Sequence, residues 1–371
     1  MLKFELIHSS NNTSARITKI ETKHGIIETP VFMPVGTRGS IKGLTSSMIN
    51  ETGAQIILAN TYHLMLRPGL DLLEKNGGLH KFMNWNKPIL TDSGGFQVMS
   101  LKDLRKIDEN GVTFRSHIDG AKITLTPENV TKAQHIIGSD ISMIFDECTP
   151  YPASYEVAKK SMELSLRWAE RSKKAFVDRD LYGQFGIVQG SIYNDLREIS
   201  AKNLIDMNFD GYAVGGLAVG EGQDLMFKTL DATMHLLPKN KPRYLMGVGK
   251  ASDIIGAVAR GIDMFDCVIP TRSGRNGQVF TSNGILNIRN QKFNIDNNKL
   301  DENCNCYACS NYARSYIHYL DKVGEMLGAT LMTIHNITFY QNLMLEIKNS
   351  IKNNNLDTLF AKYKEHETKK L

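Results

Sequence analysis

The chain contains the stretch Gly261-Ile262-Asp263-Met264-Phe265-Asp266-Cys267-Val268-Ile269-Pro270-Thr271-Arg272-Ser273-Gly274-Arg275. Its first half is a short apolar run that carries two acids, and its second half breaks into proline, glycine and two arginines. Strands of an α/β barrel are apolar and end at the rim where functional groups gather. The stretch therefore predicts a buried strand that delivers the Asp266 carboxylate to a positively charged rim, where we expect it to act as a nucleophile.

Short apolar runs of the same kind recur upstream, each followed by a polar or glycine-rich break and then by helical periodicity. Eight strands alternating with helices predict a (β/α)8 TIM barrel. An open doubly wound sheet is the alternative, but no Gly-x-Gly-x-x-Gly follows the first strand to mark a dinucleotide site. The predicted strands are Val31–Val35, Gln55–Ala59, Pro88–Thr91, Ile141–Phe145, Phe185–Val188, Gly211–Val214, Arg243–Met246 and Ile262–Phe265, and helices are predicted near 153–176, 193–207, 224–237 and 251–260.

We expect a single catalytic domain over residues 1–371 with three additions to the barrel. Alternating polar and apolar residues in 1–30 predict an N-terminal hairpin that turns at His24-Gly25. A second hairpin, Val112–Ile118 with Lys122–Leu125, is expected within an insertion at 100–126 after the third strand. A zinc-binding subdomain is expected at about 270–335 after the eighth strand, and the remainder from Thr338 is expected to be a helix and a polar tail with a break at Asn353–Asn355.

Composition sets only broad limits. With 371 residues, 42% of them hydrophobic, the chain can bury a large core. The net charge of +5 is compatible with nucleic-acid binding but does not establish it. The N-terminus has no long apolar segment, and no run approaches the roughly 18 apolar residues that a membrane span needs. We expect a soluble, cytoplasmic protein with no membrane partner.

The cysteines indicate a metal. Three of the five lie in Cys304-Asn305-Cys306-Tyr307-Ala308-Cys309, a spacing that is typical of zinc ligands in a reducing compartment. A distant histidine, His335, would complete a closed tetrahedral structural site without an open position for catalysis. His318 is nearer, and spacing alone does not exclude it as the fourth ligand. Free buried cysteines and a redox cluster are the other interpretations.

Acidic and polar residues follow several of the predicted strands. Asp92, Asp146 and Asp266 follow three different strands, and Gln189 follows a fourth. Unpaired carboxylates at one rim repel each other, so a purely structural role is costly. Paired carboxylates suit chemistry at the anomeric carbon of a sugar, and the pattern predicts glycosyl transfer or hydrolysis. Arg272 and Arg275 could hold phosphates beside the reacting group, or could belong to a solvated basic loop.

At this point the chain resembles a known family over nearly its whole length. The motifs that carry the resemblance are Thr91–Gln97, Phe145–Pro150, Val188–Gly190, Gly215–Glu221, Asp263–Arg275 and the Cys-x-Cys-x-x-Cys cluster with a later histidine. Together, and in this order, they are similar to the motifs of bacterial tRNA-guanine transglycosylase, the queuine tRNA-ribosyltransferase family.

The resemblance implies a zinc-bearing (β/α)8 barrel that exchanges the wobble guanine of G-U-N anticodon tRNAs, those for aspartate, asparagine, histidine and tyrosine. The replacement would be 7-aminomethyl-7-deazaguanine (preQ1), on the way to queuosine, by double displacement through a covalent aspartyl-ribosyl intermediate. Small Cys148 and branched Val219 resemble the bacterial form that takes this base. The family also implies one structural Zn2+ per chain, the tRNA anticodon loop and the 7-deazaguanine base as partners, and a homodimer.

The resemblance also implies a role for individual residues, and one position departs from the family. Phe96 stands where the family often has tyrosine, so stacking would survive and a phenol hydrogen bond would be lost. The implied roles are Asp266 as nucleophile; Asp92 as general acid and base; Asp146, Gln189 and Ser93 on the polar edge of the purine; Gly216 and Leu217 as backbone contacts to the base; Phe96 and Met246 on its faces; Arg272 and Arg275 on tRNA; and Cys304, Cys306, Cys309 and His335 on zinc.

Two other functions stay open. A non-catalytic tRNA-binding partner is disfavoured because both Asp92 and Asp266 are present. A retaining glycosidase is permitted by paired aspartates alone, and the arginines beside Asp266 argue against it.

Overall fold

The computed structural model describes residues 1–99, 105–116 and 118–371. Residues 100–104 and His117, which belong to the predicted insertion at 100–126, lie outside the described residues. Eight parallel strands form one sheet in the order β4-β14-β13-β12-β11-β10-β6-β5. These strands are β4 (Val31–Pro34), β5 (Ile57–Asn60), β6 (Ile89–Asp92), β10 (Ile141–Met143), β11 (Gly183–Val188), β12 (Gly211–Val214), β13 (Arg243–Leu245) and β14 (Met264–Cys267).

The sheet is a barrel because its two edges meet. Val35 and Leu58 form a parallel bridge between the ends of β4 and β5, and the amide of Gly36 donates to the carbonyl of Leu58 at 2.7 Å. The predicted barrel is confirmed, and the open doubly wound sheet was the wrong alternative. Strands buried on both faces read as continuous apolar runs, which is why all eight could be located from the sequence.

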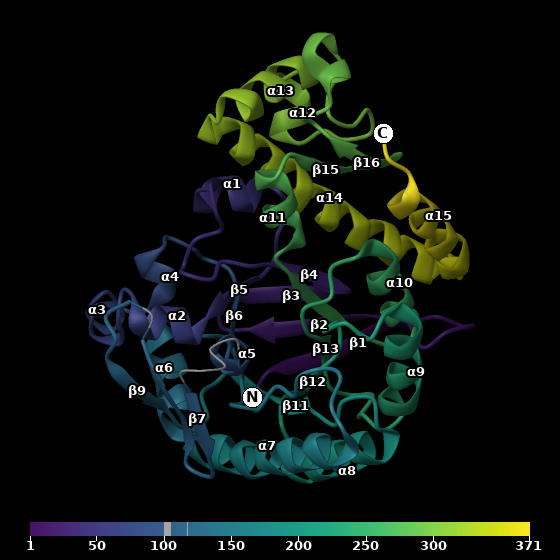
Figure 1. Ribbon diagram of the computed structural model, residues 1–371. Coiled ribbons are helices and arrows are strands. Elements are labelled where there is room, and N and C mark those ends of the chain that lie inside the picture. Colours follow the sequence, from purple (N-terminus) through teal and green to yellow (C-terminus); the bar gives the residue numbers. More distant parts are fainter. Residues whose placement is uncertain (100–104, 117) are drawn as a thin grey trace.

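Helices follow the strands around the outside of the barrel (Figure 1). Their ends carry ordinary stop and start signals, as in α6, where Thr126 and Asn129 form a capping box and Gly138 ends the helix at φ 82°. The helices up to the last barrel strand are α1 (Ser46–Glu51), α2 (Thr61–Leu66), α3 (Leu70–Lys75), α4 (Leu79–Phe82), α5 (Gly95–Met99), α6 (Pro127–Ile137), α7 (Tyr155–Ala175), α8 (Asn194–Asp206), α9 (Gln223–Met234) and α10 (Ala251–Ala259).

Two small antiparallel sheets stand where hairpins were expected, and each has one strand more. The N-terminal sheet consists of β1 (Lys3–Ser9), β2 (Arg16–Thr22) and β3 (Gly25–Thr29), with the predicted turn between β2 and β3. The inserted sheet consists of β7 (Arg105–Asp108), β8 (Gly111–Arg115) and β9 (Lys122–Leu125).

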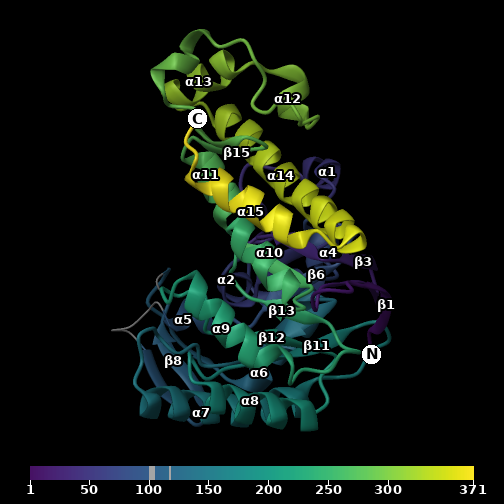
Figure 2. The same ribbon diagram turned by 90° about the vertical axis from the view of Figure 1, so that its right-hand side faces the viewer.

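The segment after β14 forms a separate lobe above the barrel in Figure 1 and returns through one long helix. This helix, α14, begins before His335 and runs on to the predicted break, where Asn354 adopts φ 55°. Figure 2 shows α15 lying alongside it. The boundary of the subdomain at 270–335 stays a prediction. The elements are α11 (Ile269–Arg275), β15 (Gln278–Thr281), β16 (Gly284–Asn287), the 3-10 helix η2 (Gln291–Ile295), α12 (Tyr307–Asn311), α13 (Arg314–Val323), α14 (Met326–Asn353) and α15 (Leu356–Thr368).

Helix α14 connects the lobe to the barrel through consecutive turns. The Asn336 amide donates to the carbonyls of Pro270 and Gln278, both at 3.0 Å. Further along, the Tyr340 hydroxyl donates to the carbonyl of Gly249, in the loop after β13, at 2.5 Å, and the Gln341 amide donates to a carbonyl of β4 at 3.2 Å.

The base of the barrel, at the amino ends of the strands, is tied to the N-terminal sheet by two buried aspartates. Asp263 accepts two hydrogen bonds from the Arg16 guanidinium, at 2.9 and 2.6 Å, and one from the Arg243 amide at 2.8 Å. Asp140, just before β10, accepts from the amide of His24 at 3.1 Å and lies 2.8 Å from its Nδ1. Asp263, whose role the sequence left open, is therefore a structural anchor.

We predict that Asp263→Ala lowers the free energy of unfolding by about 3–5 kcal/mol, because it leaves the guanidinium of Arg16 buried without its charge partner. The side chains of Arg16 and Asp263 are only 6% and 0% exposed. Urea denaturation measures the change. Glu21→Ala is the control, since its ion pair with Lys3 is exposed and should contribute about 1 kcal/mol or less. Equal effects of the two variants would contradict the assignment.

Candidate active site and metal site

Asp92 ends β6 at the carboxyl rim of the barrel and is held by groups from β5 and α2. The neighbouring Asn60, its register partner, donates from Nδ2 to Oδ2 at 2.5 Å, and the Thr61 amide donates to Oδ1 at 3.2 Å. Burial raises the pKa of Asp92 to about 7; the hydrogen bonds oppose this rise and the nearby Asp266 carboxylate adds to it. Asp92 can therefore exchange a proton near neutral pH.

Asp266 lies within β14, because this strand ends two residues later, at Cys267, than the predicted Ile262–Phe265. The Tyr244 hydroxyl donates to its Oδ1 at 2.6 Å, and the Gly247 amide donates to the same oxygen at 2.8 Å. Burial raises the pKa of Asp266, although both hydrogen bonds lower it. A desolvated carboxylate held through one oxygen has its other oxygen available for reaction.

A third acid, Asp146, forms a buried polar cluster with Gln189 and Ser93. The Gln189 amide donates to Asp146 Oδ2 at 2.8 Å, and the Ser93 hydroxyl lies 3.4 Å from Oδ1. Burial raises the pKa of Asp146 to about 6. The Gln189 Oε1 is buried and has no hydrogen-bond partner among the described residues, so the cluster has an unused acceptor beside a carboxylate.

Two glycines make room for these side chains. A Cβ on Gly216, which has φ 65°, would lie 2.7 Å from Gln189 Oε1, and a Cβ on Gly95 would lie 2.5 Å from the Asp146 carbonyl. Any larger residue would displace Gln189 or the backbone of Asp146. The adjoining apolar residues differ in exposure: Leu217 is buried, while Phe96, directly after Gly95, is 56% exposed. Met246 follows β13 and is partly buried against the barrel core.

The turn after β12 contains a further acid, Glu221, to which the sequence assigned no role. Glu221 accepts from the amides of Ala218, at 2.5 Å, and Val219, at 2.9 Å, and Ala218 has φ 58°. Glu221 thus holds the loop that carries Leu217. Tyr244 and Asn60 were missed as well. Asn60 ends β5 beside the predicted acid Asp92, which was its only signal, whereas Tyr244 lies inside β13.

The two arginines predicted to contact tRNA lie on α11, which follows β14 directly. Arg272 is exposed. Arg275 is partly buried and donates to the Thr271 carbonyl at 2.9 Å, and burial together with Arg272 lowers its pKa. Arg272 and Arg275 therefore follow Asp266 by six and nine residues along the chain.

Cys304, Cys306, Cys309 and His335 form one buried cluster whose ligand atoms lie within 4.8 Å of one another. His335 Nδ1 is 3.2 Å from the Cys309 sulfur and 3.7 Å from the Cys306 sulfur. Its other nitrogen, Nε2, lies 2.7 Å from the Phe280 carbonyl, a contact that leaves Nδ1 to face the thiols. Hydrogen bonds from Cys304 and Cys309 lower the pKa of Cys306. The cluster can hold a metal ion.

His318 lies outside this cluster, with its Nδ1 2.7 Å from the carbonyl of Ile288. A second group, His24, His80 and Asp140, also has its ligand atoms within 4.8 Å of one another. However, the two imidazoles are stacked, with centroids 3.6 Å apart and an interplanar angle of 17°. One ion cannot lie in the planes of two stacked rings at once. We therefore interpret this group as part of the hydrogen-bonded network at the amino end of the barrel.

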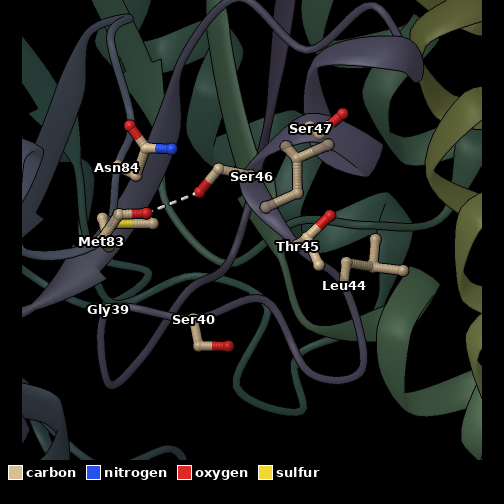
Figure 3. Close-up of a pocket in the computed structure, with 9 residues that line it drawn as sticks. Gly39, Ser40, Leu44, Thr45, Ser46, Ser47, Met83 and Asn84 are labelled. Carbon is tan, nitrogen blue, oxygen red and sulfur yellow. Dashed lines mark hydrogen bonds between the residues drawn. The ribbon is translucent and has the colours of Figure 1, made fainter.

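A separate hollow of about 360 Å³ lies beside α1 (Figure 3). Ser46 donates to the Met83 carbonyl across it at 2.8 Å. None of its lining residues is titratable: they are Gly39, Ser40, Leu44, Thr45, Ser46, Ser47, Ile49, Met83 and Asn84. The acid and base groups are therefore at the barrel rim.

Among the described residues no helix is long and apolar enough to span a membrane.

The fold and the site define an α/β-barrel enzyme with desolvated acids at the carboxyl ends of its strands and a Cys3His cluster beside the barrel. Comparison with known proteins identifies the family. The family model described as queuine tRNA-ribosyltransferase matches residues 10–369. A protein of Rickettsia bellii (strain OSU 85-389) named queuine tRNA-ribosyltransferase is 62% identical over 351 residues, covering 95% of this chain and 97% of its own. A protein of the same name from Rickettsia felis (strain ATCC VR-1525 / URRWXCal2) is 62% identical over 352 residues, covering 95% and 98%. The chain belongs to the queuine tRNA-ribosyltransferase family and is a pentosyltransferase.

We predict that His335→Ala greatly reduces the metal bound by the purified protein, because three thiols alone cannot complete the tetrahedral set. Metal content per chain, measured by elemental analysis, tests this. His318→Ala is the matched control, since it removes an equally buried imidazole outside the cluster, and it should retain the metal of the wild type. Loss of metal in His318→Ala with retention in His335→Ala would reverse the assignment.

Proposed function

We propose that the protein is a tRNA-guanine transglycosylase of queuosine biosynthesis. It would replace the wobble guanine with preQ1 in the tRNAs that have a G-U-N anticodon. These are the tRNAs for aspartate, asparagine, histidine and tyrosine. The observation that carries the proposal is the pair of desolvated carboxylates, Asp92 and Asp266, close enough for one to raise the pKa of the other. Family membership supports the same reaction.

Asp266 is the nucleophile in this proposal. Its free oxygen attacks ribose C1′ of the wobble nucleotide and forms a covalent aspartyl-ribosyl intermediate, as a retaining double displacement requires. Asp92 gives a proton to the departing guanine and later takes one from the incoming base. A pKa of about 7 supports both duties, because the acid and base forms are then equally populated at neutral pH.

The buried polar cluster around Asp146 is the proposed base site. A guanine edge presents N–H donors at N1 and N2 and acceptors at O6 and N7, so a carboxylate and an amide are complementary partners. Asp146, Gln189 and Ser93 would bind this edge. Gly216 and Leu217 would add backbone contacts, and Phe96 and Met246 would cover the ring faces, as a base splayed out of its loop requires. Small Cys148 and Val219 support preQ1 as the base.

Arg272 and Arg275 would contact phosphates of the anticodon loop, since α11 carries them directly beyond the nucleophile. The cluster of three cysteines and His335 would hold one structural Zn2+ per chain, because thiolate and imidazole ligands in a closed set suit zinc. Bound zinc would fix the lobe from which α14 reaches the barrel; the reacting groups are those of the rim.

We also propose a homodimer, as the family implies. An exposed aromatic row on the lobe supports a protein interface: Tyr312 and Tyr316 stack with centroids 5.5 Å apart, and Tyr307 and Tyr319 are exposed beside them. Sedimentation equilibrium should give twice the chain mass of 41.6 kDa. A monomer at working concentrations would refute this part.

The reaction is tested with labelled guanine and unmodified tRNA. Wild-type protein should exchange the label, and Asp266→Asn should abolish exchange because an amide cannot form the ester. Asp224→Asn, at an exposed position in the first turn of α9, is the matched control and should exchange normally. Full exchange by Asp266→Asn would end the nucleophile assignment. Salt-dependent tRNA binding without exchange in the wild type would instead favour a non-catalytic tRNA-binding protein.

The affinity for free guanine should fall as the pH drops below about 6, where Asp146 becomes protonated. The carboxylate is the binding form, since its charge accepts the donors of the purine edge, so affinity is present above the pKa and lost below it. A single ionisation at pH 6 predicts about a fivefold weakening between pH 6 and pH 5. Asp146→Asn should bind more weakly and independently of pH, whereas Asp92→Asn should keep the dependence. Isothermal titration calorimetry with guanine measures both.

A further inference from the structure

The two oxygens of Asp266 have different surroundings. Oδ1 accepts the Tyr244 hydroxyl at 2.6 Å and the Gly247 amide at 2.8 Å. In the described part of the chain, both hydrogen bonds to this carboxylate end at Oδ1. Oδ2 is therefore the oxygen that is free to approach a substrate.

Tyr244 is fixed by the barrel. It lies on β13, where its register partner on β14 is Met264, and its side chain is 0% exposed. Water cannot compete for the phenol at this depth. Burial and the Asp266 charge raise the pKa of Tyr244 well above 10, so the hydroxyl keeps its proton and remains a donor throughout the pH range of the reaction.

The proposed double displacement uses the same carboxylate twice. In the first step the Oδ2–C1′ bond forms, the C1′–N9 bond breaks with its electron pair going to N9, and Asp92 supplies the proton. In the second step Asp92 removes the N9 proton of the incoming base, the N9–C1′ bond forms, and the Oδ2–C1′ electron pair returns to Asp266. The carboxylate is nucleophile first and leaving group afterwards.

A donor at Oδ1 affects these two steps in opposite directions. Hydrogen bonds to an ionised acceptor are about twice as strong as those to a neutral one. In the covalent intermediate Oδ1 is a neutral ester carbonyl, whereas before and after it shares the negative charge. Donors at Oδ1 therefore favour the free carboxylate over the ester and assist its departure.

We infer that Tyr244 is a positioning residue that reserves Oδ2 for attack and keeps the aspartyl-ribosyl ester from accumulating. The inference rests on the proposed function, because it requires Asp266 to be the nucleophile. Gly247 contributes the second donor, but it acts through the backbone and cannot be removed by substitution.

The test measures two quantities: the rate of guanine exchange, and the fraction of protein joined covalently to tRNA after denaturation. Tyr244→Phe should lower the exchange rate and raise the covalent fraction at a fixed guanine concentration, each by about tenfold, which is the size expected for losing one hydrogen bond to a charged group. Tyr363→Phe, a buried tyrosine of α15 far along the chain, is the matched control and should change neither.

The outcomes separate the inference from the function on which it rests. No covalent product with wild-type protein, or one that persists in Asp266→Asn, would overturn the proposed nucleophile. A normal wild-type product together with a Tyr244→Phe variant that loses exchange and product in parallel would overturn the inference, because a merely structural role lowers both. If Tyr244→Phe does not fold, 3-fluorotyrosine at position 244 replaces it. Its more acidic phenol is a stronger donor of nearly the same shape and should lower the covalent fraction; an increase would contradict the inference.

Discussion

The carboxylates at the two ends of the barrel are compensated by different kinds of partner. At the base, Asp263 is paired with the Arg16 guanidinium and Asp140 with two imidazoles. At the carboxyl rim, the described partners of Asp92, Asp146 and Asp266 are amides, hydroxyls and backbone N–H groups, all of them neutral. A neutral donor orients a carboxylate without cancelling its charge, whereas a cation stabilises that charge directly.

Because of this difference, the acids at the amino end of the barrel contribute to stability, whereas those at the carboxyl rim are suited to proton transfer. The hydrogen bonds of the imidazoles hold the pKa of Asp140 below its usual range despite burial, so this acid stays ionised and anchors the N-terminal sheet. Burial at the rim raises the pKa of Asp92 to about 7 and that of Asp146 to about 6. Desolvated acids of this kind cost folding free energy, and they are characteristic of sites where protons are transferred. The Arg16–Asp263 ion pair and the hydrogen bonds of Asp140 stabilise the opposite end of the barrel.

Much of this arrangement could be predicted from the sequence, because buried strands are apolar on both faces and their ends are polar. The eight strands and the rim acids could be located in that way, and the three cysteines were identified by their spacing. The role of Asp263 was not, since Arg16 lies 247 residues away. Tyr244 was hidden for a related reason. An aromatic residue inside an apolar run is interpreted as a core residue, and only the pairing of β13 with β14 brings its hydroxyl to Asp266. The N-terminal hairpin predicted within 1–30 omitted its third strand, β1, and β7 was missed because its four residues, Arg105–Asp108, include a single apolar side chain.

Helix α14 has a consequence for how the sequence can vary. His335 faces the cysteine cluster, and five residues later Tyr340 holds the carbonyl of Gly249 in the loop that supplies the Gly247 amide to Asp266. Side-chain direction on a helix turns by about 100° per residue. A substitution between these two positions changes only local contacts. Inserting or deleting one residue would rotate either His335 or Tyr340 away from its partner. The spacing from His335 to Tyr340 should therefore be invariant in length even where its residues differ.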